Sequence, residues 1–297
     1  MASATEDEVL KYWQGLGYYS RAKNIHLTAK KIVNEFHGIF PSTYKEILSL
    51  KGVGKYTAAA IISLAYNVPY ATVDTNVIRI ISRIFGVKTP VDTATGIAQI
   101  YLLADKLLLK SEPGIFNSAL MDFGALVCKK VSPQCVSCLL QNYCSAFLSN
   151  EVNTLPLKNK TINIKNRFFH YLVFIIPKEN STYTLFGKRN KKDIWNGLYD
   201  FPLIETEIPV SVRQLPEYIN KFEKDSSWVD SVIGQSEIFK HILTHQIINA
   251  TFYKITASGN NFFPEAKMIN TELLQNYPVS SLIKTFLSKY DHWFFHT

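Results

Sequence analysis

All four cysteines of the chain lie between residues 128 and 144, in the run CKKVSPQCVSCLLQNYC. A disulfide framework would spread its cysteines along the chain, and it would need an oxidising compartment. Four thiolates this close together, with no other cysteine in the sequence, indicate one metal centre instead. The candidate ligands are Cys128, Cys135, Cys138 and Cys144. Their spacing matches neither the ferredoxin run nor the paired units of a zinc ribbon, so iron–sulfur and zinc both remain open on spacing alone.

The residues before the cysteines predict helices. Thr5 to Glu8 fits a capping box, and apolar residues at helical spacing follow it. A second helix is expected over residues 21–36, and Thr43 is expected to open a short third one. Apolar periodicity continues to residue 109, so the first half of the chain is predicted to be all-α.

The segment LKGVGKYTA, residues 50–58, places Gly52 and Gly54 between two predicted helices. A Walker-type phosphate loop would need four residues between the glycines, so that site is excluded. Two interpretations remain. One is a helix-to-helix turn in which glycine adopts positive φ, and the other is a hairpin whose backbone N–H groups bind an anion before Lys55 and its helix.

The composition changes after the last cysteine. Residues 149–167 are polar and weakly periodic, which indicates a linker. Beyond it, β-rich runs alternate with helical patterns near Leu215 to Phe222 and Ser281 to Leu287, so the second domain is predicted to be α+β. The expected boundaries are 1–148 for the helical domain, 149–167 for the linker and 168–297 for the second domain.

The charge of the chain favours a polyanionic partner. The formal net charge is +8 and the isoelectric point is about 9.1. The sequence holds no apolar run of about 18 residues, and its start, MASATEDEV, differs from a secretory signal. We therefore expect an intracellular protein with no membrane partner.

Three motifs occur together in one order: LKGVGKYTA, ATVDTNVIR at residues 71–79, and the cysteine run. This combination resembles the helix-hairpin-helix DNA glycosylase superfamily. Within it, YWQGLGYYSRAKNIH at residues 12–26 and the α+β second domain resemble the adenine DNA glycosylases that act on A/G mismatches. The likeness covers essentially the whole chain, and it implies a helical glycosylase domain followed by a Nudix-like α+β domain.

The resemblance also implies an activity and its partners. It implies base excision repair, in which adenine opposite oxoguanine or guanine in double-stranded DNA is removed by hydrolysis of the N-glycosidic bond. A monomeric protein of the cytoplasm, associated with the nucleoid, is expected. An endonuclease III-like lyase and a lesion-binding pseudo-enzyme are the alternatives.

The resemblance assigns a [4Fe–4S] cluster to the four cysteines and a DNA phosphate to the glycine hairpin. The implied DNA-binding residues of the hairpin are Gly52, Val53, Gly54, Lys55 and Tyr56. In the lyase branch of the superfamily, the nucleophilic lysine stands at the position of Tyr56. Lys55 lies one residue too early, so we expect it to add surface charge and expect no Schiff-base chemistry.

Asp74 is the expected catalytic carboxylate. Taken alone, it predicts an N-cap for a helix that starts near Thr75. The resemblance instead makes Asp74 the group that stabilises positive charge on the deoxyribose, with Asn76 as its orienting partner. Tyr18 and Tyr19 could both be core aromatics at a helix end. The resemblance instead makes Tyr18 a wedge in the base stack, because adenine has to leave the duplex.

In the second domain, KRNKKDIWNGLYDFP at residues 188–202 resembles the Nudix-related module of the same family. The following residues, LIETEIPVSVRQLPEYI, lack the glutamate-rich box of a working Nudix hydrolase, so recognition without hydrolysis is expected. Leu243, Thr244 and His245 stand where the family has Phe-Ser-His, and they are implied to contact oxoguanine. A strand-end turn without a ligand is the alternative.

The family's general acid is a glutamate on an N-terminal helix that ends with Gln-Gln-Thr, and this motif is absent from the sequence. Glu6 and Glu8 belong to the capping box instead. We therefore expect the chain to be N-terminally truncated, and we expect these 297 residues alone to excise adenine very slowly or not at all.

Overall fold

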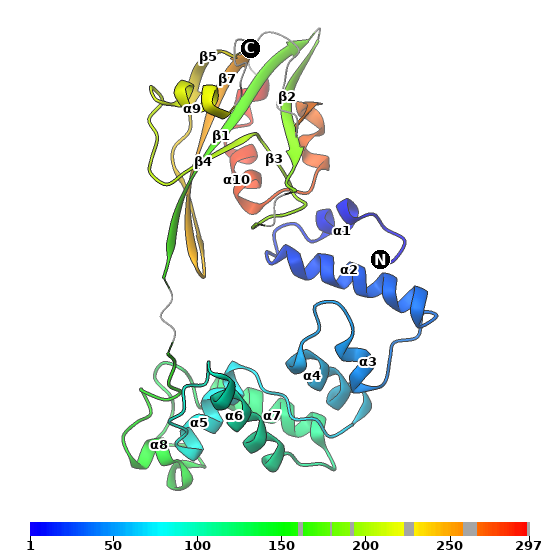
Figure 1. Ribbon diagram of the computed structural model, residues 1–297, viewed down its shortest axis with the longest axis vertical. Helices are drawn as coiled ribbons and strands as arrows, with labels where there is room; N and C mark the ends of the chain where they lie inside the picture. The colour runs from blue at the N-terminus through cyan, green and yellow to red at the C-terminus, as the bar shows by residue number, and fades with distance from the viewer. Residues whose placement is uncertain (160–162, 179, 191–192, 223–228, 258–265, 296–297) are drawn as a thin grey trace. The chain divides into compact units, whose positions relative to one another are not determined.

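The chain folds into two compact units, which the computed structural model describes for residues 1–159, 163–178, 180–190, 193–222, 229–257 and 266–295 (Figure 1). One unit is Thr28–Thr161, and the other combines Met1–Leu27 with Ile162–Thr297. Residues 1–27 thus pack with the C-terminal part, and the division between the units falls within α2 (Tyr19–Glu35). The expected boundaries at residues 148 and 168 stay a prediction.

The described residues of the Thr28–Thr161 unit are helical, as predicted. Its elements are α2 (Tyr19–Glu35, shared with the other unit), α3 (Tyr44–Leu48), α4 (Lys55–Tyr66), α5 (Thr75–Phe85), α6 (Ala94–Leu107), α7 (Pro113–Leu126), η1 (Gln141–Tyr143) and α8 (Ser145–Leu148). The predicted cap of the third helix is confirmed, because Thr43 accepts a hydrogen bond from the backbone N–H of Glu46.

The core of this unit forms where α5 packs against its neighbours. Val77 and Ile81 of α5 are fully buried, together with Ile100 of α6. On α7, a Cβ added at Gly124 would lie 2.6 Å from the Cβ of Asn76. Only glycine therefore allows α7 to approach the first turn of α5 this closely.

The other unit is built on an eight-stranded mixed sheet. Its strands are β1 (Lys165–Lys178), β2 (Ser181–Lys188), β3 (Tyr199–Asp200), β4 (Leu203–Thr206), β5 (Val229–Gln235), β6 (Phe239–Leu243), β7 (Gln246–Ala257) and β8 (Lys267–Asn270). The main path runs β3-β2-β1-β7-β5, while β4 pairs with β1, β6 with β7 and β8 with β2. Only the central pair β1 and β7 is parallel among the described pairs.

Helices cover both faces of the central strands, so the predicted α+β class is confirmed (Figure 1). On one face, alternate residues of β1 such as Phe169 and Tyr171 pack with α10 (Ser281–Lys289), α11 (His292–Phe295) and η2 (Thr271–Asn276). On the other face, Leu172 and its alternates pack with α9 (Leu215–Phe222). A strand buried on both faces is continuously apolar, as the run FFHYLVFII shows.

The N-terminal segment packs against this sheet unit. Helix α1 (Glu6–Tyr12) starts with the predicted capping box, and Leu10 packs with Leu198 in a small core of its own. The carboxylate of Asp7 accepts hydrogen bonds from Lys188 at 2.6 Å and from the Tyr199 hydroxyl at 3.0 Å. These contacts tie α1 to β2 and β3.

The predicted linker, residues 149–167, has ordered contacts along its first part. Glu151 pairs with Lys88 at 2.7 Å, and the carbonyl of Leu157 accepts from the Val91 N–H at 3.0 Å. Residues up to 159 are thus attached to the helical unit. Residues 160–162 lie outside the described part of the chain, and β1 already begins at Lys165.

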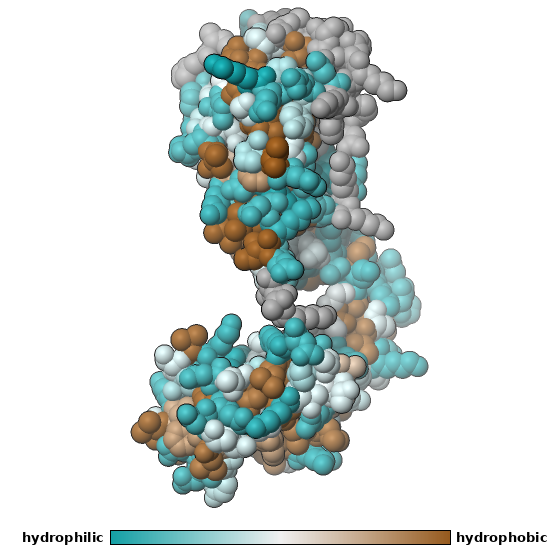
Figure 2. Space-filling view, turned by 60° about the vertical axis from the view of Figure 1, so that its left-hand side comes forward, coloured by the Kyte–Doolittle hydropathy of each residue, from teal (hydrophilic) through white to brown (hydrophobic). Residues whose placement is uncertain are grey.

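The described helices are too short or too polar for any of them to cross a bilayer. Figure 2 shows hydrophobic side chains in separate patches among hydrophilic ones on the face that it presents. Apolar side chains exposed in this scattered way are ordinary on globular proteins.

Candidate functional site

Asp74 caps the N-terminus of α5 and is held at both carboxylate oxygens. Its Oδ1 accepts from the Val77 N–H at 2.8 Å, and its Oδ2 accepts from the Asn76 amide at 2.9 Å. The N-cap interpretation is therefore confirmed. The same contacts fix the carboxylate at the positive end of a helix dipole, where negative charge is favoured.

Two buried arginines of α5, Arg79 and Arg83, connect this region to the cysteine loop, and neither was predicted from the sequence. Arg79 donates to Asn76 Oδ1 at 2.9 Å, to the carbonyl of Gly124 at 2.6 Å and to the carbonyl of Cys128 at 2.7 Å. Hydrogen bonds therefore run without a break from Asp74 to the first cysteine. The available signal was the pair of arginines four residues apart on a helix whose neighbouring positions are apolar.

The four cysteines are half-buried and line a single cavity. The rest of its lining includes the apolar side chains of Ile84, Phe123, Val127, Pro133, Leu140, Phe147 and Val152. Arg83 donates from Nη1 to Cys128 Sγ at 3.4 Å and to the carbonyl of Lys129 at 2.7 Å. Burial, and then the neighbouring cysteines, raise the pKa of the Cys135 thiol, while Arg83 opposes this shift.

These sulfurs surround the cavity without meeting at one point. Within the described ranges, no group of three or more His, Cys, Asp or Glu side chains is close enough to hold a single metal ion.

The glycine hairpin joins α3 to α4. Gly52 has φ of 78°, so the turn interpretation is confirmed. Gly54 is the N-cap of α4 and supplies no side-chain cap, and Gly54, Lys55 and Tyr56 are all exposed. The positive end of this helix dipole is therefore open to an anion. The Val53 N–H already donates to the carbonyl of Leu50 at 3.2 Å, so of the expected hairpin amides this one is engaged.

The two adjacent tyrosines differ in burial. Tyr18 is 72% exposed with φ of 46°, and the Arg21 guanidinium lies 5.5 Å from its ring centre. Tyr19 is buried and donates to the carbonyl of Val279. The core interpretation is therefore wrong for Tyr18 and right for Tyr19.

Thr244 and His245 form a two-residue turn between β6 and β7, and both are exposed. Leu243, just before them, packs on the core of the sheet unit. The carbonyl of His245 accepts from the Lys165 N–H at 3.0 Å, which ties the turn to β1. The turn thus presents one hydroxyl and one imidazole on a fixed backbone.

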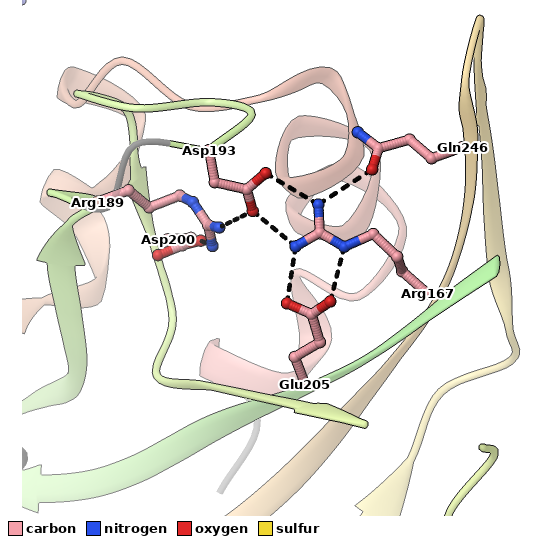
Figure 3. A network of polar contacts seen from close by, with 6 residues as sticks. All are labelled: Arg167, Arg189, Asp193, Asp200, Glu205 and Gln246. Carbon is pink, nitrogen blue, oxygen red and sulfur yellow. Dashed lines mark hydrogen bonds and ion pairs between the residues drawn. The ribbon is translucent and has the colours of Figure 1, made fainter. Parts of the chain in front are cut away.

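A network centred on Arg167 lies beside this turn, and the sequence analysis did not identify it (Figure 3). The guanidinium binds Glu205 through two hydrogen bonds of 2.7 Å and Asp193 through two of 2.9 and 2.6 Å. A fifth bond of 3.1 Å reaches Gln246 Oε1. The hydrogen bonds to Glu205, followed by those to Asp193, raise the pKa of Arg167. Arg189 pairs with Asp200 at 2.7 Å in the same network.

Comparisons with known proteins cover both halves of the chain. Residues 1–100 match the HhH-GPD superfamily of base excision DNA repair proteins, and residues 172–289 match the NUDIX domain. Among curated relatives, the adenine DNA glycosylase of Buchnera aphidicola subsp. Baizongia pistaciae is 34% identical over 80% of this chain and 64% of its own length.

Two further adenine DNA glycosylases come from other subspecies of Buchnera aphidicola. That of subsp. Acyrthosiphon pisum is 32% identical over 80% of this chain and 66% of its own length. That of subsp. Schizaphis graminum is 31% identical over 84% of this chain and 70% of its own length. The chain therefore spans about two thirds of the length of these relatives.

Proposed function

Because the chain belongs to the adenine DNA glycosylase family, we propose that it removes adenine paired with oxoguanine or guanine from double-stranded DNA. The reaction is hydrolysis of the N-glycosidic bond, without a following lyase step. The observation that carries this proposal is the carboxylate of Asp74, which is held at both oxygens at the N-terminus of α5.

Breaking the bond between adenine and C1′ leaves positive charge on the deoxyribose. A carboxylate that is already fixed stabilises this charge without reorganising as it develops. Val77 and Asn76 each occupy one lone pair of Asp74, and each oxygen keeps another for the sugar cation. Adenine also needs a proton as it leaves, which is a task for a general acid other than this carboxylate.

The absence of lyase chemistry follows from the hairpin. A Schiff base needs an amine at the position that Tyr56 occupies, and the Tyr56 hydroxyl donates to Met121 Sδ at 3.6 Å. Lys55 is exposed at the start of α4, where a cation can meet the DNA backbone. The exposed N–H groups at the N-terminus of α4 are suited to bind a backbone phosphate, which DNA of any sequence supplies.

We assign a [4Fe–4S] cluster to the four cysteines. Four thiolates are the usual donor set of such a cluster, and Cys128, Cys135, Cys138 and Cys144 would hold it from around the cavity. The cavity that they line fits this arrangement. Bound there, the cluster would crosslink the loop, while Arg83 donates to Cys128 Sγ and apolar neighbours exclude water.

The Nudix-like part is assigned recognition without hydrolysis. Glu205 of β4 accepts two hydrogen bonds from Arg167 and is therefore not available to a metal ion. Thr244 and His245 are the proposed contacts to oxoguanine, and the exposed Tyr18 is the proposed wedge in the base stack. We propose that it acts as a monomer in the cytoplasm, at the nucleoid.

The test is product analysis with the protein as its source organism produces it, on three duplexes with adenine opposite oxoguanine, guanine or thymine. We expect free adenine from the first two, an intact strand that alkali then cleaves at the abasic site, and no release from the third. Strand cleavage without alkali would support the lyase instead. Binding to the mismatched duplexes with no product would support the pseudo-enzyme.

A further inference from the structure

We propose that Gln246 is a specificity-determining residue, whose side-chain N–H groups donate to the base opposite adenine while Arg167 holds the amide in the required orientation. The inference rests on the proposed function, since it needs DNA with oxoguanine as the ligand. It adds a base contact and a positioning residue to the Thr244–His245 turn.

The guanidinium of Arg167 uses all of its N–H donors in hydrogen bonds to neighbouring side chains. Its side chain is only 8% exposed, and each of its five N–H donors has an acceptor. Four of them form two bidentate pairs with Asp193 and Glu205, and the fifth reaches Gln246. Bidentate pairs fix the plane of the guanidinium, so the direction of the fifth donor is fixed as well.

The orientation of the Gln246 amide follows from this contact. A guanidinium is a donor only, so the amide must turn its oxygen toward Arg167 and its nitrogen away. Figure 3 shows the nitrogen on the side facing away from Arg167. Within the described part of the chain, the nitrogen donates to no acceptor, and Gln246 is only half-buried. Two oriented donors are therefore available to a ligand.

The position of Gln246 places these donors beside the Thr244–His245 turn. It is the first residue of β7 and directly follows His245, and it pairs with Leu243 of β6 and Lys165 of β1. Backbone pairing on both sides fixes the start of its side chain, and Arg167 fixes the end. The amide therefore keeps a constant place relative to the backbone of the Thr244–His245 turn.

The chemistry of the two bases decides which one such a donor favours. Oxoguanine carries a carbonyl oxygen at C8, which accepts hydrogen bonds, whereas guanine carries only C–H there. A fixed N–H donor facing C8 therefore gains a partner with oxoguanine and none with guanine. One net hydrogen bond of this kind corresponds to about a tenfold difference in affinity.

The experiment measures equilibrium binding to duplexes in which a non-cleavable 2′-fluoro adenosine stands opposite oxoguanine or guanine. The readout is the ratio of the two dissociation constants, which a general loss of stability does not change. Gln246→Glu keeps the oxygen that Arg167 needs but removes both donors, and Gln246→Met removes oxygen and donors without adding charge. Both variants should lower the oxoguanine preference about tenfold, and Gln246→Met should bind the guanine duplex within twofold of the unmodified chain.

Arg167→Lys should lower the same ratio, because a lysine cannot hold the amide and two carboxylates in one plane. The matched control is Arg189→Lys, which weakens the pair with Asp200 and a longer contact of 3.5 Å to Asp193 but leaves the Gln246 contact in place. This control should keep the ratio, and thermal unfolding of every variant checks that it is folded.

The outcomes separate the inference from the function on which it rests. If the unmodified chain shows no preference for oxoguanine, the recognition step of the proposed function fails, and this inference fails with it. If the preference exists and Thr244→Ala removes it while both Gln246 variants keep it, only the inference is overturned. If the Gln246 variants lose the preference and Arg167→Lys keeps it, the role of Arg167 is overturned.

Discussion

The side-chain amide of Asn76 donates to Asp74 Oδ2 at 2.9 Å, while its oxygen accepts from Arg79 at 2.9 Å. The orientation of the Asn76 amide is therefore set from both ends. Asp74 itself sits before the helix, where a carboxylate without a second contact could turn about its side-chain bonds. The hydrogen bond from Asn76 therefore holds the carboxylate of Asp74, which also caps the helix, in one orientation.

Replacing Asn76 with alanine should slow adenine release more than it weakens binding. The variant removes one hydrogen bond to a charged group, which corresponds to roughly a tenfold to hundredfold loss in the rate of bond cleavage. The measurement is the single-turnover rate of the protein as its source organism produces it, on an adenine:oxoguanine duplex, with the dissociation constant measured in parallel. Thr75→Ala, at the exposed neighbouring position, is the control. An unchanged rate in Asn76→Ala would show that Asp74 needs no orienting partner.

The cysteine cavity predicts iron in protein that is purified without oxygen. We expect a brown protein with about four iron atoms per chain, because four thiolates surround one cavity. Cys135→Ser should lose most of this iron and its visible absorbance, while Ser137→Ala in the same loop should keep both. Stoichiometric zinc without iron, in cells supplied with iron, would contradict the assignment.

Lys55 should not form a covalent bond with DNA. Because it is exposed and lies one residue before the lyase position, borohydride should trap little protein on abasic DNA. Lys55→Ala should lower affinity modestly and reduce its salt dependence, as loss of a phosphate contact does. Lys51→Ala, also exposed beside the hairpin, is the comparison. Efficient trapping that disappears in Lys55→Ala would overturn this account of the hairpin.

His170 should make the free energy of unfolding depend on pH. Burial lowers its pKa to about 4, and its ring contacts Tyr253 Oη at 3.2 Å and Thr206 Oγ1 at 3.0 Å. An unfolded histidine titrates near pH 6.5, so between about pH 6.5 and 4 the unfolded state binds more protons. Stability should therefore fall as the pH falls through this window, by up to about 3 kcal/mol.

Denaturant unfolding at several pH values measures this effect. His170→Gln should flatten the curve between about pH 6.5 and 4, whereas His292→Gln, at an exposed site, should keep the slope of the unmodified chain. A slope that persists unchanged in His170→Gln would show that other groups cause it.

Local features of this chain could be predicted from the sequence, because their partners lie a few residues apart. The capping box at Thr5 and Glu8 and the cap at Thr43 form as expected. The all-α and α+β classes also follow from periodicities of three to four and of two residues. Each of these patterns lies within a single helix or strand, so it can be recognised without knowing how the elements pack.

Contacts between distant parts of the chain could not be predicted in this way. The acceptors of Arg167 lie 26, 38 and 79 residues away along the sequence, before β3, on β4 and on β7. Arg79 reaches Cys128 across 49 residues. Periodicity marks each arginine as unusual at most, and only the folded chain shows which groups it binds.

The packing of residues 1–27 with the sheet unit also depends on contacts between distant residues. The acidic residue Asp7 looks like part of a helix cap, but its partners Lys188 and Tyr199 are 181 and 192 residues away. For Tyr18 and Tyr19, residue type alone could not predict which side chain is exposed. They are adjacent and chemically identical, and the backbone turn at Tyr18 decides that one is exposed and the other buried.

The most direct test of the central claim is the single-turnover rate of adenine release by the protein from its source organism and by its Asp74→Asn form, on an adenine:oxoguanine duplex. Asparagine caps helices as well as aspartate does, so the variant should fold and bind the duplex. We predict that its rate falls at least about a hundredfold, because the charge that stabilises the sugar cation is gone. Adenine release by Asp74→Asn at nearly the unmodified rate would contradict the account.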